Sequence, residues 1–295
     1  MNSYSKVRAV DGTVLRAWTN GATGVPVVIS NGLGASPTAW PAIVAPESGF
    51  RVVTWHHRGL GGSERPANAA SIGVEEFASD LGAVMSSAGM EQALIVGWSF
   101  GVNVAFEFAR LQPGRTSGML AVAGVPGGSL GAMYGPMRMP RQFREPAGQI
   151  SAQLLPITGP WLTVLAAAMP RPQYRVGPSE ADAIAHEADQ VPALRSMLRE
   201  FAAHDWEWYS RLAVALGKHA PMNVSDTAFP TTFLGGRQDS ITASEDIRAV
   251  ANTIRGARVR ILPTASHLVP LQYPTVMLRE LRKLAERSGL ASGGV

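Results

Sequence analysis

The stretch Ala93-Leu94-Ile95-Val96-Gly97-Trp98-Ser99-Phe100-Gly101-Val102 joins a short apolar run to a segment with helical spacing. Residues 93–96 have the composition of a buried parallel strand, and residues 102–111 repeat apolar side chains as a helix does. A serine on such a sharp strand-to-helix turn needs glycines on both sides, because the backbone approaches itself closely there. Gly-x-Ser-x-Gly alone also occurs in ordinary loops, but the flanking strand and helix favour a nucleophile elbow with Ser99 as its reactive group.

Short apolar runs alternate with helical stretches along the rest of the chain, which is typical of a parallel sheet covered by helices on both faces. We expect an opening hairpin at residues 7–18 around Asp11-Gly12. Further strands are expected at residues 25–29, 50–55, 93–96, 119–123, 231–234 and 259–262. Helices are expected at residues 75–88, 102–111 and 275–287, and another should begin at the capping box Thr242-Ala-Ser-Glu245. The fold class is therefore α/β, with a mostly parallel central sheet flanked by helices.

Residues 127–226 differ from the rest, because they contain several methionines, three helical stretches and no convincing strand. Strands resume after this segment, so one sheet is interrupted by a helical insertion. The predicted division is a core of residues 1–126 and 225–295 with a helical segment at 127–224.

Composition narrows the function classes. The chain has 295 residues, of which 46% are hydrophobic and 16% charged, as in a globular protein with a large core. Cysteine is absent, so a serine or a carboxylate must do any nucleophilic work. The net charge is +4 and the pI is about 9.7, but the basic residues form no long run, which argues against nucleic-acid binding.

Targeting and membrane segments are not apparent. The first 12 residues lack a basic region followed by an apolar run, so no signal peptide is predicted. The most apolar stretch, residues 161–169, is too short for a bilayer, which needs about 20 apolar residues. We therefore expect a cytoplasmic protein with no transmembrane segment.

Three motifs together resemble those of the α/β-hydrolase superfamily, and the resemblance covers essentially the whole chain. They are Gly97 to Gly101, Asn31-Gly32-Leu33-Gly34, and His57-Arg58-Gly59-Leu60-Gly61-Gly62-Ser63. The resemblance is strongest to the branch with a helical cap between core strands six and seven, which includes carboxylesterases, meta-cleavage-product hydrolases and cofactor-free haloperoxidases. Epoxide hydrolases and haloalkane dehalogenases of that branch use an Asp nucleophile, whereas Ser99 implies acyl-enzyme chemistry.

The resemblance also selects partners for Ser99. His267 follows the last strand, where the family places its general base, and Asp239 follows strand seven, where the family places the acid that orients the base. Residues 122–128, after strand six, contain no carboxylate, which weakens the usual alternative. The alternative is that Asp239 only caps a turn.

The other five histidines receive structural roles. We expect His56 and His57 to hold the glycine-rich loop by hydrogen bonds, and His186, His204 and His219 to be surface residues. The oxyanion hole implied by the family consists of the Leu33 and Phe100 N–H groups. Asn31 stands where the family commonly has histidine, so the side-chain hydrogen bond that orders this loop is expected to differ.

Substrate contacts are inferred from the insertion and from the neighbours of the triad. Met133, Met137 and Trp161 could line a pliable apolar pocket, and Trp98 and Leu268 adjoin the nucleophile and the base. Core packing is the competing interpretation for each residue. Five arginines in the insertion could meet an anionic carrier or a lipid surface, although a solvated face is the commoner role: Arg138, Arg141, Arg144, Arg171 and Arg175.

The leading functional prediction is hydrolysis of a carboxylic ester, thioester or lactone with an apolar acyl group. A C–C hydrolase of the meta-cleavage type, perhydrolysis on the same triad, and a slow ligand receptor on a retained hydrolase fold stay open. No metal or organic cofactor signature is present, so none is predicted. The expected partner is a small-molecule acyl substrate, and a homodimer is left open.

Overall fold

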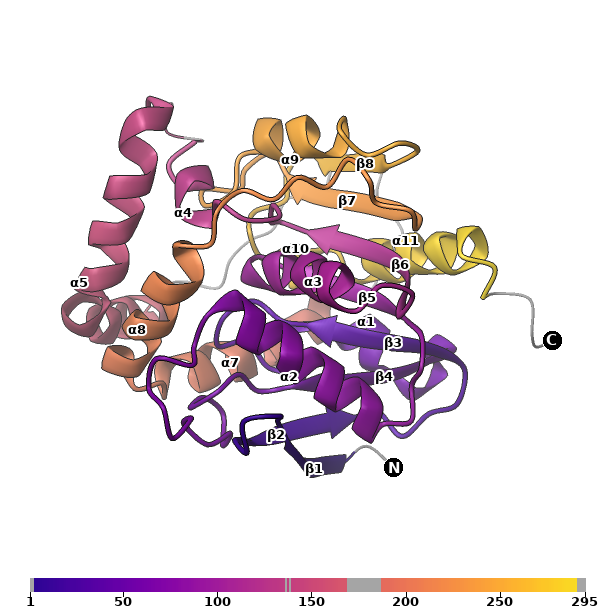
Figure 1. The fold of residues 1–295 in the computed structure, drawn as a ribbon. Helices are drawn as coiled ribbons and strands as arrows, with labels where there is room; N and C mark the ends of the chain where they lie inside the picture. The colour runs from indigo at the N-terminus through magenta and orange to yellow at the C-terminus, as the bar shows by residue number, and fades with distance from the viewer. Residues whose placement is uncertain (1–2, 136, 138, 169–186, 291–295) are drawn as a thin grey trace.

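The computed structural model describes residues 3–135, 137, 139–168 and 187–290, and it contains one sheet of eight strands (Figure 1). The strand order is β1-β2-β4-β3-β5-β6-β7-β8, in which β1, β2 and β4 pair antiparallel and all other neighbours pair parallel. The predicted mostly parallel α/β sheet is therefore confirmed. The strands are β1 (Ser3–Arg8), β2 (Val14–Thr19), β3 (Val25–Ser30), β4 (Phe50–Trp55), β5 (Ala93–Trp98), β6 (Thr116–Val122), β7 (Thr231–Gly236) and β8 (Arg258–Leu262).

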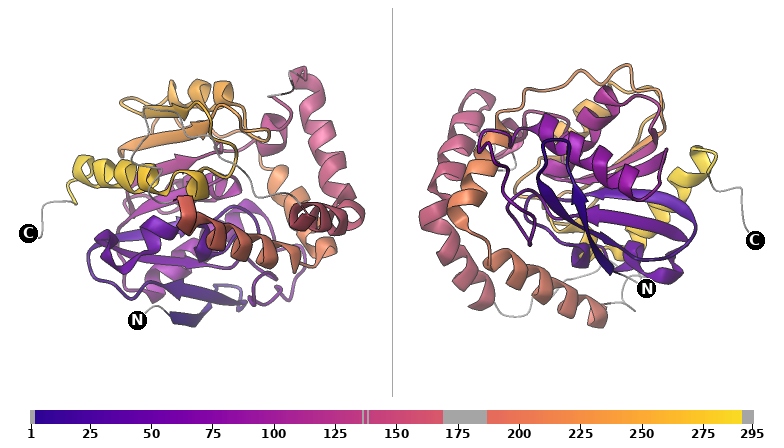
Figure 2. Two further views of the ribbon diagram at one scale, coloured as in Figure 1. Left: turned by 180° about the vertical axis from the view of Figure 1, so that it is seen from behind. Right: turned by 60° about the horizontal axis from the view of Figure 1, so that its bottom comes forward.

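Helices cover both faces of the sheet, because the central strands are apolar on both sides and must be buried twice. One face packs against α2 (Val74–Ser87), α3 (Phe100–Leu111) and α9 (Ser244–Ala251). The other face packs against α1 (Pro41–Val44) and α11 (Pro274–Arg287), and Figure 2 shows α11 crossing the back of the sheet. Short elements η1 (Pro37–Ala39), η2 (Pro46–Ser48) and α10 (Val269–Gln272) lie in the connections.

A helical insertion separates β6 from β7. It comprises α4 (Ser129–Ala132), α5 (Arg141–Ala168), α7 (Glu187–Ala202) and α8 (Trp206–Gly217), with no strand among its described residues. In Figure 1 these helices lie beyond the carboxyl ends of the parallel strands, where α5 runs alongside α8. The insertion thus approaches the edge of the sheet that carries the predicted nucleophile, while its exact boundaries stay a prediction.

One helix start was predicted wrongly. Helix α9 begins at Ser244 after Ala243, and no side chain caps it. The Thr242 hydroxyl, which the expected capping box requires, donates instead to the Ala123 carbonyl oxygen at the end of β6. The hydroxyl thus bonds a carbonyl distant in sequence instead of the local backbone N–H that the capping box would supply. Among the described residues, no helix has the length and apolar character needed to cross a bilayer.

Candidate active site

Ser99 occupies a strained turn between β5 and α3. Its backbone has φ 54° and ψ −121°, a combination that side-chain-bearing residues rarely adopt. The flanking glycines are required by space: a Cβ on Gly101 would overlap the Ser30 carbonyl oxygen, and one on Gly97 would lie 2.8 Å from the Gly101 carbonyl oxygen. The close approach expected from the sequence motif is therefore present in the structure.

Two hydrogen bonds join the three residues that the sequence singled out. His267 Nε2 lies 2.9 Å from Ser99 Oγ, and His267 Nδ1 lies 2.9 Å from Asp239 Oδ2. A carboxylate only accepts, so Nδ1 carries the proton and Nε2 offers its lone pair to the serine hydroxyl. The residues come from the ends of β5, β7 and β8, whose carboxyl ends meet at one edge of the sheet.

Asp239 is held firmly behind His267. Its side chain is fully buried, and Oδ1 accepts from the backbone N–H groups of Ile241 at 2.8 Å and Thr242 at 2.9 Å. Oδ2 is left for the imidazole. The turn-capping role and the orientation of His267 are thus performed by different oxygens of one carboxylate.

The loop that carries His267 is supported from two sides. The Trp98 indole N–H donates to the His267 carbonyl oxygen at 3.1 Å, and the two rings lie 6.0 Å apart. The Gln272 side-chain oxygen accepts from the N–H and the hydroxyl of Ser266. Trp98 is buried, so its described contacts are those of a loop support, and its contact with substrate stays a prediction.

The loop after β3 lies beside Ser99. Register between β3 and β5 pairs Ser30 with Gly97, and a Cβ on Gly32 would lie 3.6 Å from the Ser99 Cβ. The Phe100 N–H opens α3 and has no intrahelical acceptor. Within the described part of the chain, the Leu33 N–H has no acceptor either. Two unpaired N–H groups are thus available at this edge, as an oxyanion hole requires.

Asn31 orders this loop through its side chain. Its Nδ2 donates to Thr54 Oγ1 at 2.9 Å, and its Oδ1 accepts from the Trp40 indole N–H at 2.7 Å. Both contacts are buried, so they fix the exit of β3 against β4. Thr54 and Trp40 escaped the sequence analysis because neither stands in a motif.

The expectations for His56 and His57 were wrong in part. His57 is buried between the Trp55 and Phe77 rings, and its two ring nitrogens have no partner among the described residues. Burial lowers the pKa of His57 to about 3. His56 Nε2 lies 3.5 Å from the Tyr4 hydroxyl of β1, and the His56 ring packs against Gly61 of the glycine-rich loop. The loop is held by backbone carbonyls instead of imidazoles.

Two histidines predicted to be surface residues are also corrected. His204 is half-buried, and its Nε2 lies 2.9 Å from the Gly34 carbonyl oxygen. His219 is 19% exposed and lies 3.7 Å from Glu107. His186 lies outside the described residues. Histidines on a helical insertion can therefore face the core when that insertion folds back onto it.

The predicted substrate residues are not gathered in one lining. Met137 is 65% exposed and Trp161 is 73% exposed, whereas Met133 and Leu268 are partly buried. Among the arginines considered for an anionic carrier, Arg141 and Arg144 pair with Asp246. Arg138, Arg171 and Arg175 lie outside the described residues. Substrate contact by any of these side chains stays a prediction.

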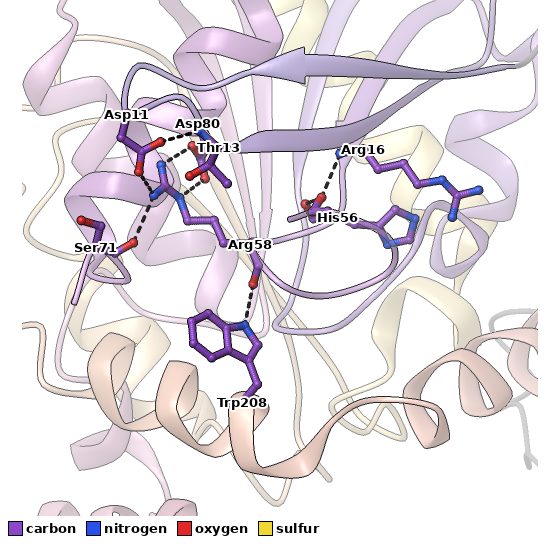
Figure 3. A network of polar contacts seen from close by, with 9 residues as sticks. Asp11, Thr13, Arg16, His56, Arg58, Ser71, Asp80 and Trp208 are labelled. Carbon is purple, nitrogen blue, oxygen red and sulfur yellow. Dashed lines mark hydrogen bonds and ion pairs between the residues drawn. The ribbon is translucent and has the colours of Figure 1, made fainter. Parts of the chain in front are cut away.

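A buried ion cluster supports the glycine-rich turn after β4 (Figure 3). The Arg58 guanidinium binds both oxygens of Asp80 at 2.7 Å and also reaches Asp11 and the Ser71 carbonyl oxygen. The Arg58 carbonyl oxygen accepts from the Trp208 indole N–H at 2.9 Å. Figure 3 shows this second link, which joins α8 to the core. The glycine-rich motif thus has an anchoring role away from Ser99.

Comparison with known proteins covers most of the chain. Residues 25–274 match the family described as alpha/beta hydrolase fold. RutD of Caulobacter segnis is 34% identical over 99 residues, which are 33% of this chain and 37% of that protein. RutD of Azorhizobium caulinodans is 24% identical over 257 residues, 86% of this chain and 88% of that protein. A thermophilic esterase structure from Thermogutta terrifontis has a TM-score of 0.72 at 22% identity, covering 97% of this chain and 99% of the other.

Proposed function

The chain belongs to the α/β-hydrolase family, and we propose that it is a serine hydrolase that cleaves a carboxylic ester with an apolar acyl group. Ser99 is the nucleophile, His267 the general base and Asp239 the group that orients the base. The observation that carries the proposal is the pair of 2.9 Å hydrogen bonds linking a strained serine, an imidazole and a buried carboxylate.

Acylation begins when Ser99 Oγ gives its proton to His267 Nε2 and attacks the ester carbonyl carbon. The Leu33 and Phe100 N–H groups stabilise the negative oxygen of the tetrahedral intermediate. As the carbon–oxygen bond to the leaving group breaks, His267 returns the proton to the departing alcohol. The acyl group stays on Ser99.

Deacylation repeats these steps with water as the nucleophile. His267 Nε2 takes a proton from water, which attacks the acyl carbon, and the same two N–H groups stabilise the second oxyanion. The proton then returns to Ser99 as the acid leaves. Asp239 stabilises the imidazolium formed in each half-reaction, because its Oδ2 accepts from Nδ1.

The substrate class follows from the chemistry and from similarity. Thioesters and lactones fit the same steps, since each presents an electrophilic carbonyl carbon with a leaving group. The esterase fold neighbour supports an ester, and the RutD proteins are named for carbamate hydrolysis, so a carbamate ester belongs in the substrate panel. We propose that the protein is cytoplasmic and acts on a small-molecule substrate.

The experiment is fluorophosphonate labelling with peptide mass spectrometry, together with turnover of p-nitrophenyl esters of increasing acyl length. We expect the label on Ser99, and loss of labelling and turnover in Ser99→Ala. The matched control is Ser225→Ala, because Ser225 is exposed and lies in a turn of the connection between α8 and β7. Folded wild-type protein that takes no label and turns over no ester would overturn the proposal in favour of a ligand receptor.

A further inference from the structure

We propose that His204 and Tyr209, at the corner between α7 and α8, are positioning residues that fix the Leu33 N–H group for the oxyanion. The inference rests on the proposed function and extends it from the sheet edge to the helical insertion. It concerns the rate of the chemical step rather than substrate affinity.

The corner holds two consecutive carbonyl groups of the loop after β3. The Tyr209 hydroxyl donates to the Leu33 carbonyl oxygen at 3.2 Å. His204 Nε2 lies 2.9 Å from the Gly34 carbonyl oxygen, and since a carbonyl only accepts, Nε2 carries the proton. Two side chains of the insertion therefore bind the segment that contains the proposed oxyanion donor.

Holding these carbonyls restrains the N–H group, because peptide units are planar and only the φ and ψ angles of Leu33 separate the plane of its N–H from the plane of its carbonyl. The Leu33 carbonyl and the Leu33 N–H belong to adjacent peptide planes that share one Cα atom. Gly32 and Gly34 flank that Cα, and Gly34 has φ +76°, so the loop itself offers little resistance to rotation. The two side-chain donors supply the restraint that the glycines lack.

The donors are themselves rigid. The Tyr209 ring stacks on His204 at 5.7 Å and meets Phe201 edge-on at 5.4 Å. Burial raises the pKa of Tyr209 well above its usual range, so its hydroxyl keeps the proton that it donates. A Cβ on Gly34 would lie 2.5 Å from His204 Nε2, which shows how closely the loop packs on this pair.

The neighbouring residue provides a matched control. Trp208 anchors the same helix to the core, but its indole N–H bonds to the Arg58 carbonyl oxygen (Figure 3). That loop follows β4 and carries no proposed oxyanion donor. Loss of the Trp208 bond should therefore remove one anchor of α8 while both donors to the loop after β3 stay in place.

The test compares Tyr209→Phe with Trp208→Phe in the full-length protein. Each variant is assayed for kcat and KM on a p-nitrophenyl ester and for inhibition by a trifluoromethyl ketone, which forms a tetrahedral adduct with an active serine. Removal of a whole oxyanion donor costs about 10²–10³ in rate, so a displaced donor should cost about tenfold. We expect Tyr209→Phe to lower kcat and weaken the ketone by this factor with KM within about twofold, and Trp208→Phe to leave kcat within about twofold.

The His204 pair tests the same inference if Tyr209→Phe fails to fold. His204→Phe should lower kcat, while His204→Gln, which keeps an N–H donor, should restore part of it. Wild-type kcat and ketone affinity in Tyr209→Phe, or equal losses in Tyr209→Phe and Trp208→Phe, would overturn the inference. Failure of the proposed function is separate, because the wild-type protein would then show no Ser99 labelling.

Discussion

The sheet edge and the helical insertion differ in how firmly their side chains are held. At the sheet edge, Ser99, Asp239 and His267 are polar, and contacts from several strands hold them in place. Helix α5 of the insertion instead exposes apolar side chains at helical spacing, namely Phe143, Ile150, Leu154, Ile157 and Trp161. The edge is built to keep one geometry, whereas the surface of α5 places few demands on the fold. The two regions should therefore differ in their tolerance to change.

Replacement of a carboxylate should separate the two regions most strongly. Asp239→Asn should lower kcat about 10⁴-fold, because the amide cannot hold His267 in the required tautomer. Asp205→Asn is the matched change in the insertion: Asp205 also accepts from two backbone N–H groups, and Asn caps a helix equally well. Its kcat should stay within about twofold. The measurement is kcat of both variants on one ester. Similar losses of kcat in Asp239→Asn and Asp205→Asn would contradict the expected difference between the sheet edge and the insertion.

A glycine in each region gives the next largest effect. Gly101→Ala should lower the free energy of unfolding by about 3 kcal/mol or more, since its Cβ would overlap the Ser30 carbonyl oxygen. Gly131→Ala in α4 meets no atom within 4 Å and should be neutral or gain up to about 1 kcal/mol. Urea unfolding measures both. A harmless Gly101→Ala would show that the elbow tolerates more movement than its packing suggests.

The buried imidazole behind the sheet edge should make stability depend on pH. Burial lowers the pKa of His57 from 6.5 to about 3. Between these two pH values His57 is protonated in the unfolded chain and neutral in the folded chain. The free energy of unfolding should therefore fall by up to about 1.4 kcal/mol for each pH unit from 6.5 toward 3 on account of this group.

His57→Leu tests this expectation by removing the group while keeping an apolar side chain between Trp55 and Phe77. Urea unfolding at pH 7.5, 6.0 and 5.0 should show a shallower loss of stability than in the wild type. His56, whose pKa burial lowers to about 4, continues to contribute in the variant. An unchanged slope would mean that His57 is protonated in the folded protein.

The exposed face of α5 should give the smallest effect. Ile157→Gln should change the free energy of unfolding by less than about 0.5 kcal/mol, because this side chain is largely exposed. Leu212→Ala on the buried face of α8 should cost about 2–5 kcal/mol. Thermal and urea unfolding at several protein concentrations would compare them. A large, concentration-dependent loss for Ile157→Gln would reveal a covered surface.

The sheet and the residues at its edge could be predicted from sequence because their signals are local. The elbow joins a strand and a helix within a few residues, and Asp239 and His267 each follow a strand directly. Strand ends shifted by a few residues, as in β5, which continues to Trp98 because the elbow itself pairs with β6. Because the carboxyl ends of parallel strands lie at one edge of the sheet, the loops that carry these residues come together there, and no contact distant in sequence has to be predicted.

Contacts between the insertion and the core could not be predicted in this way. Tyr209 and Leu33 are 176 residues apart. A cluster of aromatic residues such as that around position 208 looks the same in the sequence whether it packs within the insertion or binds a loop of the core. His204 was placed on the surface for the same reason. The Thr242 capping box failed because the hydroxyl found a carbonyl 119 residues away. Side-chain partners at such separations depend on how whole layers dock.

The register of β6 and β7 has a consequence for how this protein can diversify. Thr231 pairs with Met119, three residues before the end of β6, so by strand geometry Val122 and Thr231, between which the insertion lies in the chain, are about 11 Å apart. Because β6 and β7 are parallel, any replacement must cross from the carboxyl end of β6 back to the amino end of β7, which takes about a dozen residues or more. Evolution or an engineer can thus exchange the helices between these two points as a cassette, with the sheet left in register, provided that the new segment supplies its own donors to the Leu33 and Gly34 carbonyl oxygens.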